Sequence, residues 1–390
     1  MVPEQRFSRL NHPAGELPLA AEKHHPSIAM PNEQTPLLNG DKAMQGVGVP
    51  AGAGLPAPPT AAANNVAAAA ASSSLPQRRQ PQAIAHRGYK LAAPENSMAA
   101  FRAAVECGAA AIETDLHLSR DGVVVLSHDE TLARCFGDAA KVRERDWADL
   151  SKLRTLRQPA QGLPRLLDLL EYLNRPGREH VWLMLDIKTH DDPNEIIRRT
   201  AETLASVPGI RPWNHRITLC CWTSQYIKLS MKYLPGYKTT NIAYSTIYAR
   251  ELASQVPDLS ISMLRLTLAA PFIGQRFIRH MKRLGHPIHT WTVNDEAWME
   301  WCIRKELDGV ITDDPKLFLE VCERVGKEEA EGGSSRLSRL RRKVSVQAAV
   351  RGVKYASEMA LFHFLLVIVI GIYLFRNGLP RSSIRKTLQG

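Results

Sequence analysis

The sequence predicts an α/β fold, a (β/α)8 barrel in which eight parallel strands alternate with helices. Short apolar runs recur through the central part of the 390-residue chain, and longer amphipathic stretches separate them. This pattern is typical of repeated strand–helix units. The region that contains the runs, residues 83–326, matches the length of such barrels, ~250 residues. An open, doubly wound sheet is the alternative that the same pattern allows.

Eight apolar runs are the expected strands, and helices are expected between them. The strands are predicted at residues 83–86, 110–115, 181–187, 217–222, 239–243, 259–263, 288–293 and 309–312. The clearest helices are predicted at residues 97–106, 194–205, 271–283, 296–304 and 315–325. Eight parallel strands with intervening helices favour closure into a barrel.

The segments outside the barrel differ from it in composition. Residues 1–82 are rich in Ala, Pro, Gly, Asn and Ser and have no sustained period of 3.6 or 2, which predicts a disordered low-complexity arm. Residues 327–355 are expected to form a basic linker and residues 377–390 a short tail. Between them, residues 356–376 are largely apolar and are predicted to form one transmembrane helix. A buried helix of a soluble protein is the less favoured alternative, because apolar residues cover the whole circumference of the predicted helix.

The formal charge of +11 is concentrated beside this apolar segment. Residues 327–390 contain 12 Lys and Arg residues and four Asp and Glu residues, which is an excess of +8. This placement favours attraction to anionic lipid head groups. No nucleic-acid partner is expected, because the basic segments lack interleaved aromatic residues.

The barrel is expected to face the cytosol. The N-terminus lacks the apolar stretch of a secretory signal, and the six cysteines include no Cys-x-x-Cys pair, which fits reduced thiols. The membrane helix would then be a single-pass C-terminal anchor in the vacuole, the endosome or the endoplasmic reticulum, with the lipid droplet and the mitochondrion as alternatives. Glu33–Leu38 matches an acidic dileucine pattern. This short motif either binds a sorting adaptor or is part of the disordered linker without a function of its own.

Three carboxylates are expected to meet at one rim of the barrel. Glu113 and Asp115 stand two residues apart on a predicted strand, so that their side chains share a face, and Asp186 follows from the next strand. Carboxylate oxygens favour hard cations, which predicts one divalent ion, Mg²⁺ or Ca²⁺, with Mn²⁺ as an alternative. For any single carboxylate, a salt bridge is the alternative.

Charged and titratable residues follow the strands at the same rim. His86 ends the first strand, and His128 follows a short apolar run. A pair of histidines can serve as general acid and general base near neutral pH. For a single histidine, a structural role with satisfied hydrogen bonds is the alternative. Arg87 and Lys188 are expected to contact a substrate phosphate. Their alternative role is to balance the neighbouring carboxylates.

These residues lie in an ordered set of motifs. The set comprises IAHRGYKLAAPENSMAAFRAAVECGAAAIETDLHLSRDGVVVLSHDETLARCFG, LMLDIK, HTWTVND and DGVITDDP. In order and spacing it resembles the glycerophosphodiester phosphodiesterase family over residues 83–325. The resemblance implies a TIM barrel, a divalent metal at Glu113, Asp115 and Asp186, acid–base roles for His86 and His128, and phosphate contacts from Arg87 and Lys188. Asp186 stands where the family often has Glu, which leaves the metal's identity open.

Several further residues near the predicted site have both a possible functional role and a possible structural role. Glu95 and Asn96 are expected to orient the site arginine or the metal ligands, with helix capping by Asn96 as the alternative. Trp222 and Trp291 are expected to line the substrate pocket or to pack in the barrel. Asp313–Asp314 are expected to form only a turn and a cap.

The expected reaction is hydrolysis of a phosphodiester that carries glycerol. A neighbouring glycerol hydroxyl can attack phosphorus internally, which avoids the entropic cost of a separate nucleophile. The motifs and the C-terminal apolar segment resemble the fungal tail-anchored phosphatidylglycerol phospholipase C branch, which implies a glycerophospholipid substrate cleaved to diacylglycerol and glycerol 3-phosphate. The alternatives are a general glycerophosphodiester phosphodiesterase, a lysophospholipase D, and a catalytically silent membrane adaptor or lipid sensor.

Overall fold

The computed structural model describes residues 80–330, residue 384 and residues 387–388. Most of the predicted arm with its dileucine motif, the linker beyond residue 330, the membrane helix predicted at 356–376 and all but three residues of the tail lie outside the described residues. None of the helices in the described part of the chain combines the length and the apolar character needed to cross a bilayer.

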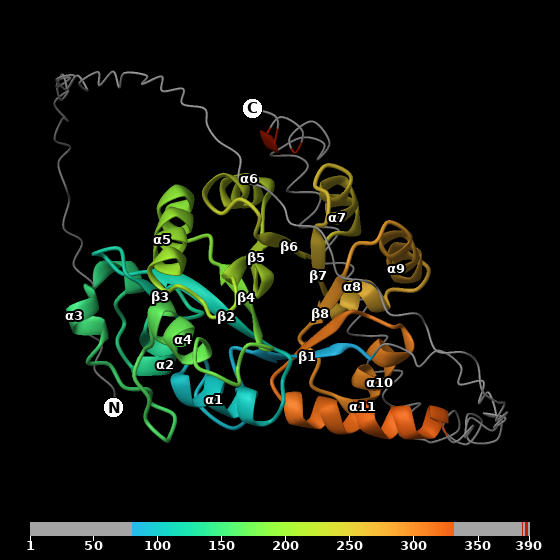
Figure 1. Cartoon of the computed structure of the whole chain (residues 1–390), viewed down its shortest axis with the longest axis horizontal. Helices are drawn as coiled ribbons and strands as arrows, with labels where there is room; N and C mark the ends of the chain where they lie inside the picture. The colour runs from blue at the N-terminus through green and yellow to red at the C-terminus, as the bar shows by residue number, and fades with distance from the viewer. Residues whose placement is uncertain (1–79, 331–383, 385–386, 389–390) are drawn as a thin grey trace, which may run out of the picture. The chain divides into compact units, whose positions relative to one another are not determined.

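Eight parallel strands close into a barrel, as Figure 1 shows. The strands of the sheet are β1 Gln82–His86, β2 Ala111–Leu118, β3 Val124–Leu126, β4 Trp182–Ile187, β5 Ile217–Cys221, β6 Lys238–Ala243, β7 Ser260–Leu264, β8 Ile288–Trp291 and β9 Gly309–Thr312. Their order is β1-β9-β8-β7-β6-β5-β4-β2, and β1 pairs with β2 to complete the ring, while β3 adds antiparallel to β2. The predicted barrel is confirmed, and the open-sheet alternative is wrong.

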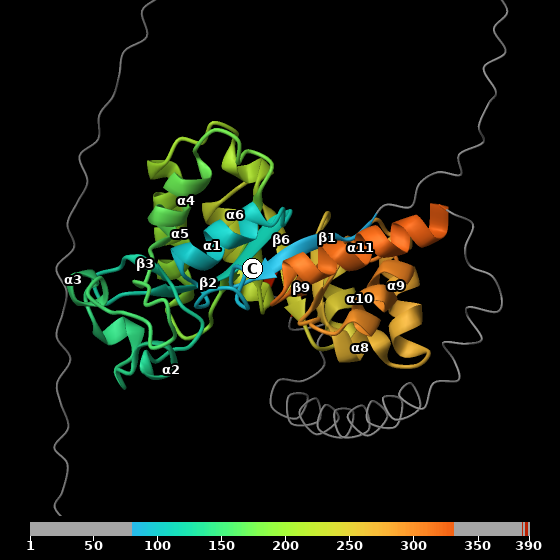
Figure 2. The same ribbon diagram turned by 90° about the horizontal axis from the view of Figure 1, so that it is seen from below.

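Helices follow the strands and cover the outside of the barrel (Figures 1 and 2). They are α1 Met98–Glu106, α2 Ala133–Phe136, α3 Trp147–Leu150, α4 Leu166–Leu173, α5 Pro193–Ser206, α6 Ser224–Tyr233, α7 Thr246–Ala253, α8 Arg265–Ala269, α9 Ile273–Arg283, α10 Glu296–Arg304 and α11 Pro315–Ala330. Short 3-10 turns occupy Val142–Glu144 and Trp213–His215. The helix predicted at 271–283 begins at Ile273, after a separate α8, and α11 continues past the predicted barrel boundary at residue 326.

Polar residues fix the starts of several helices. Ser97 caps α1 by accepting a hydrogen bond from Ala100 N, and Asp192 caps α5 by accepting one from Glu195 N. Side-chain oxygens at this position satisfy amide groups that have no partner within the helix. The caps therefore set where each strand-to-helix connection ends, and those connections form the rim that carries the site.

Two apolar layers hold the barrel together. One lies between the sheet and its helices, where residues such as Phe101, Phe277 and Phe318 are fully buried. The other lies inside the barrel and consists of Ile84, Ala111, Met184, Cys220, Ile242 and Ile311. Side chains two apart on a strand share a face. The residues two positions after these inner side chains therefore also point inward, one layer closer to the rim.

Candidate active site

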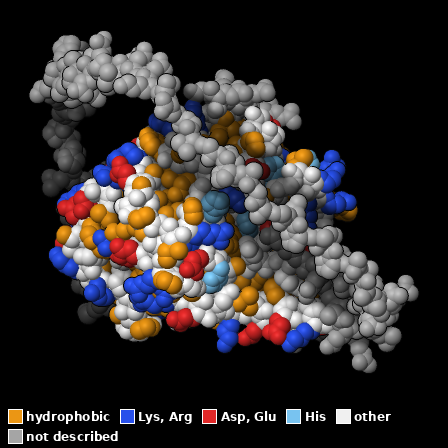
Figure 3. Space-filling view, in the orientation of Figure 1, with side chains coloured by type: hydrophobic (Ala, Val, Ile, Leu, Met, Phe, Trp, Pro, Cys, Tyr) orange, Lys and Arg blue, Asp and Glu red, His pale blue; other side chains and the backbone are white. Residues whose placement is uncertain are grey.

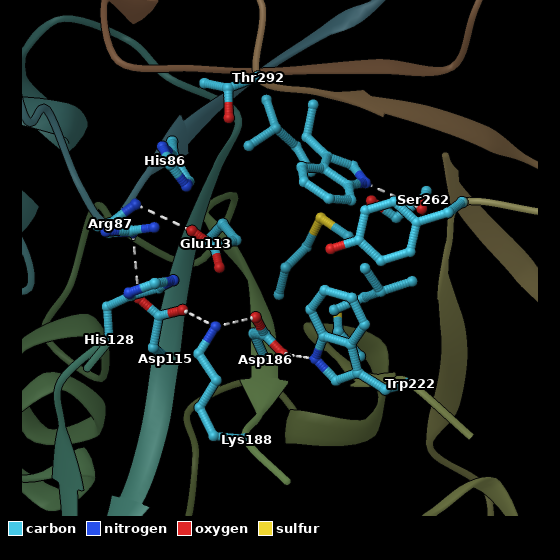
Figure 4. Close-up of a pocket in the computed structure, with 16 residues that line it drawn as sticks. His86, Arg87, Glu113, Asp115, His128, Asp186, Lys188, Trp222, Ser262 and Thr292 are labelled. Atoms are coloured by element: carbon cyan, nitrogen blue, oxygen red, sulfur yellow. Dashed lines mark hydrogen bonds and ion pairs between the residues drawn. The ribbon is translucent and has the colours of Figure 1, made fainter. Parts of the chain in front are cut away.

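A cavity of about 170 Å³ opens above this inner apolar layer, at the carboxyl ends of the strands. It is lined by His86, Arg87, Glu113, Asp115, His128, Asp186, Lys188, Trp222, Tyr244, Ser262, Trp291 and Thr292, together with four residues of the layer below. Figure 4 shows how these side chains converge from several strands. All seven residues predicted for catalysis, phosphate binding or metal binding lie here, as do the two tryptophans.

The three carboxylates meet because of the strand register. His86 pairs with Glu113 between β1 and β2, and Asp115 pairs with Asp186 between β2 and β4. One carboxylate oxygen from each of Glu113, Asp115 and Asp186 lies within 4.8 Å of the others, and all three residues are buried. The shorter Asp186 therefore still reaches the cluster.

Crowding of negative charge perturbs these groups. Burial raises the pKa of Glu113 well above its ordinary value, and the charges of Asp115 and Asp186 add to the rise. Burial also raises the pKa of Asp186. Burial acts in the same sense on Asp115, but Lys188 and Arg87 hold its pKa below the ordinary value. Lys188 and Arg87 therefore do not fully compensate the negative charge of the three carboxylates, and the uncompensated charge is centred on Glu113.

Lys188 bridges two of the carboxylates. Its Nζ lies 2.7 Å from Asp115 Oδ1 and 2.5 Å from Asp186 Oδ2. Burial works against the charged lysine, but the two carboxylates raise its pKa above the ordinary value. The other oxygen of Asp186 accepts a hydrogen bond from Trp222 Nε1 at 2.8 Å. Lys188 thus balances carboxylates, as the alternative prediction held, and also lines the cavity.

Arg87 is placed by a tight turn after β1. Its φ angle is +56°, and that of Gly88 is +79°. A Cβ atom on Gly88 would come within 2.8 Å of the Ala100 backbone, so that only glycine fits this close approach to α1. The turn aims Arg87 N at Glu113 Oε2, at 2.9 Å, and sends the guanidinium toward Glu95 Oε1, at 2.8 Å.

Asn96 holds Asp115 and does not cap the helix. Its Nδ2 donates to Asp115 Oδ2 at 2.8 Å, and its Oδ1 accepts from Thr114 Oγ1 at 2.8 Å. Ser97 caps α1 instead, so the capping alternative for Asn96 is wrong. Glu95 binds Arg87, and hydrogen bonds from Arg134 and Arg87 lower the pKa of Glu95 to about 2 although burial opposes this.

Each candidate histidine is oriented by an aspartate that the sequence did not single out for this role. His86 Nδ1 donates to Asp313 Oδ1 at 2.6 Å, and Asn294 Nδ2 donates to the other oxygen at 2.8 Å. Burial opposes ionisation of Asp313, yet its bond to His86 helps to bring its pKa down to about 2. The prediction that Asp313 only forms a turn is therefore wrong. The available signal was its position directly after the last strand.

His128 sits in a comparable arrangement. Its Nδ1 lies 2.8 Å from Asp129 Oδ1, and Arg134 Nε donates to the other oxygen of Asp129 at 2.6 Å. Burial lowers the pKa of His128 below its ordinary value. A neutral imidazole with one nitrogen fixed by a carboxylate leaves its other nitrogen free to exchange a proton with a bound molecule.

Three aromatic rings form the wall that faces the carboxylates. The Tyr244 ring centroid lies 5.7 Å from that of Trp222 and 5.5 Å from that of Trp291. Each tryptophan lines the cavity and also packs against an aromatic neighbour. Tyr244 was not predicted from the sequence, although it directly follows β6, as Trp222 directly follows β5.

The model of the glycerophosphoryl diester phosphodiesterase family matches residues 86–317. The chain belongs to this family. As a member it is an enzyme, a phosphoric diester hydrolase with glycerophosphodiester phosphodiesterase activity, and the silent-adaptor alternative is set aside. The predicted family resemblance is confirmed at this level.

Similar proteins cover the barrel of this phosphodiesterase. "Probable glycerophosphodiester phosphodiesterase 2" of Mycobacterium tuberculosis is 30% identical over 251 residues, which are 61% of this chain and 89% of that protein. The glycerophosphodiester phosphodiesterase of Caldanaerobacter subterraneus is 26% identical over 266 residues, 62% of this chain and 98% of that protein.

Solved structures share the fold. The glycerophosphodiester phosphodiesterase of Thermotoga maritima matches with a TM-score of 0.50 and 25% identity, covering 62% of this chain and 99% of that one. An Oleispira antarctica phosphodiesterase in complex with the product sn-glycerol-3-phosphate matches with a TM-score of 0.54 and 23% identity, over 63% and 97%.

The contact between Asp313 and His86 gives this phosphodiesterase a testable positioning residue. Asp313→Asn should lower kcat for a glycerophosphodiester about 10–100-fold with little change in KM, because the ring of His86 loses its fixed orientation. Steady-state kinetics measure the two constants separately.

Asp314→Asn is the matched control. Asp314 accepts a hydrogen bond from Leu317 N at the start of α11, and asparagine caps a helix as well as aspartate does. Its kcat should stay within twofold of wild type. Equal losses of kcat in the two variants would show that the loop, and not the contact with His86, matters.

Proposed function

We propose that this phosphodiesterase cleaves phosphatidylglycerol to diacylglycerol and glycerol 3-phosphate with the help of one divalent cation. The proposal is based on the cavity itself. Three buried carboxylates, two histidines and the basic side chains of Arg87 and Lys188 converge there beside an aromatic wall. Its volume of about 170 Å³ is below the 300–1,000 Å³ typical of sites for drug-sized ligands. A head group fits such a cavity, and two acyl chains would remain outside.

The carboxylate cluster fits a divalent cation. Glu113, Asp115 and Asp186 offer oxygen ligands at mutual distances that suit one ion. The raised pKa of Glu113 marks uncompensated negative charge, which a cation would neutralise. Mg²⁺ and Ca²⁺ are the ions we favour, and Mn²⁺ fits the same ligands. When bound, the ion would draw electron density from the phosphoryl oxygens.

The side chains of the cavity support an internal displacement. One of His86 and His128 takes the proton of a glycerol hydroxyl, whose oxygen attacks phosphorus, and the other protonates the departing oxygen of diacylglycerol. Arg87 and Lys188 bind the phosphoryl oxygens. Water then opens the cyclic glycerol phosphate, with the two histidines exchanging roles, and glycerol 3-phosphate leaves.

Two further points bear on the proposal, the first on a glycerol phosphate product and the second on a membrane substrate. The Oleispira antarctica phosphodiesterase of the same fold was solved with sn-glycerol-3-phosphate, the product proposed here. The apolar sequence at residues 356–376 beside a basic linker suits a C-terminal membrane anchor. We propose that this anchor holds the barrel on the cytosolic face of a vacuolar, endosomal or endoplasmic reticulum membrane, as in the fungal tail-anchored branch, and that Glu33–Leu38 binds a sorting adaptor.

The proposal is tested by comparing substrates on the full-length chain. Phosphatidylglycerol, glycerophosphocholine and a lysophospholipid are each incubated with Mg²⁺, with Ca²⁺ or with a chelator, and diacylglycerol, glycerol phosphate and lysophosphatidic acid are measured. We expect cation-dependent release of diacylglycerol from phosphatidylglycerol. Turnover of glycerophosphocholine alone would identify a general glycerophosphodiester phosphodiesterase, and turnover of the lysophospholipid alone a lysophospholipase D.

A further inference from the structure

Large apolar side chains are exposed at the end of the barrel where the cavity opens. One group lies on the connections that follow β6 and β7: Tyr244, Ile247, Phe272 and Ile273, with exposed fractions of 43%, 65%, 90% and 52%. A second group comprises Leu91 and Leu156, at 61% and 63%. Leu91 lies on the connection after β1, and Arg157 links the two leucines by donating to Leu91 O at 2.7 Å.

The two groups lie on opposite sides of the opening. In the eight-strand ring, β1 and β6 are separated by three strands in either direction. Tyr244 connects the first group with the cavity, because it is exposed and also lines the cavity. The apolar residues therefore flank the route by which a substrate reaches the carboxylates.

The fold holds the first group in place. Thr267 Oγ1 on α8 donates to Tyr244 O at 2.9 Å, which ties the connection after β6 to the connection after β7. Phe272 has a φ angle of +60°, a conformation that bulky residues rarely adopt. Phe272 is 90% exposed, and backbone strain of this kind concentrates at functional sites, which points to a role outside the folded chain.

Basic residues adjoin this apolar group on α7 and α9. From Thr246 to Arg283 the chain contains six Arg and Lys residues and two Asp and Glu residues. In Figure 3, Lys and Arg side chains gather along the edge where α9 lies in Figure 1. Among the described residues, no hydrogen bond or ion pair from the Arg250 or Arg276 side chain to an acceptor is present, and Arg250 instead stacks over Phe277 at 5.7 Å.

The basic residues also act on one another. Burial lowers the pKa of Arg250, and the charge of Arg276 adds to this effect. Burial likewise lowers the pKa of His280, with contributions from Arg250, Arg283 and Arg276. Like charges that stand together without acidic partners favour an anionic surface as the occupant.

We propose that this end of the barrel docks on a bilayer that contains anionic phospholipid. Tyr244, Ile247, Phe272 and Ile273 enter the interface with Leu91 and Leu156, while Arg250 and Arg276 bind anionic head groups. Apolar side chains beside cations are the combination by which proteins bind such interfaces. The inference rests on the proposed lipid substrate and explains its delivery, because a docked opening admits a head group while the acyl chains stay in the membrane.

The first test separates docking from chemistry. The double variant Phe272→Ser with Ile273→Ser, in the full-length chain, should hydrolyse phosphatidylglycerol in vesicles at least about tenfold more slowly than wild type, because apolar area no longer enters the interface. Its kcat/KM for soluble glycerophosphoglycerol should stay within twofold. Leu284→Ser, which removes an exposed apolar side chain just beyond the far end of α9, is the matched control and should match wild type in both assays.

The second test measures docking without turnover. Hydrogen exchange is followed in the full-length His86→Ala variant with vesicles of phosphatidylcholine alone or with phosphatidylglycerol added. We expect residues 244–250 and 268–276 to be protected at least fivefold more by the anionic vesicles, and less so after Arg250→Gln with Arg276→Gln. Unchanged exchange would overturn docking and would leave the surface to an acidic protein. Protection of these residues from exchange, without any turnover of phosphatidylglycerol by wild type, would contradict the proposed substrate and would still support the docking surface.

Discussion

Replacing His86 by alanine should lower kcat for glycerophosphodiester hydrolysis by about 10²–10⁴-fold, the usual contribution of a positioned acid or base. The ring of His86 lines the cavity, and Asp313 Oδ1 holds its Nδ1 at a distance of 2.6 Å. Alanine removes this oriented imidazole and its proton transfer. His128→Ala should have an effect of the same order, since His128 is held in the same way by Asp129 at 2.8 Å. Single-turnover and steady-state kinetics on purified variants measure both effects.

A histidine far from the cavity provides the control. His180 is exposed and precedes β4, at the opposite end of the barrel from the site. His180→Ala should keep wild-type kcat. If His86→Ala and His128→Ala each retained more than a tenth of wild-type kcat, neither ring would be the acid or the base, and the proton transfers would have to be assigned to other groups.

Replacing Glu113 by glutamine should separate stability from activity. Glutamine keeps the shape of the side chain and can still accept the hydrogen bond from Arg87 N that Glu113 accepts at 2.9 Å. It removes one of three crowded carboxylates, and the raised pKa of Glu113 shows that this charge is costly. We therefore expect the free energy of unfolding of the metal-free protein to rise, because a neutral amide replaces a carboxylate whose ionisation burial and its two acidic neighbours oppose.

The same substitution should remove most of the response to metal. For wild type, Mg²⁺ or Ca²⁺ at 100 times its Kd should stabilise the folded state by about 2.7 kcal/mol. Glu113→Gln should lose most of this gain, and its kcat should fall about 10²–10³-fold because charge at the phosphoryl group is less well compensated. Thermal unfolding with and without metal, alongside kinetics, measures all three quantities.

Glu171→Gln serves as the control for Glu113→Gln, because Glu171 is exposed on α4. It should change neither the metal response nor kcat. A Glu113→Gln variant that was less stable than wild type without metal would contradict the uncompensated negative charge inferred for the cluster. A full metal response in this variant would show that the ion binds elsewhere.

The sequence was sufficient for the fold because the barrel is built from local patterns. All eight predicted strands are present, with boundaries displaced by at most three residues. The helix predicted at 296–304 has those boundaries in the structure, since Asp295 caps its start. The helices α4, α6 and α7 were not among the five that were named from the sequence. The short α2, α3 and α8 were not named either, because four or five residues carry too little periodicity to distinguish a helix from a turn.

The residue types of the site were likewise visible in the sequence. Polar residues that follow apolar strands of a parallel barrel meet at one rim. This rule predicts that His86, Glu113, Asp115, Asp186 and Lys188 lie together. The rule names candidates, but it does not state which side chains touch.

Only the tertiary structure decided the partners. Asp313 lies 227 residues after His86 in the chain, and the two meet because β9 pairs with β1 as the ring closes. Asn96 reaches Asp115 because the turn after Arg87 places it beside β2. The sequence determined the barrel and its reactive residue types, since these follow from periodicity and position along the chain. Strand register and ring closure bring together residues that are distant in sequence, and no local pattern records that pairing.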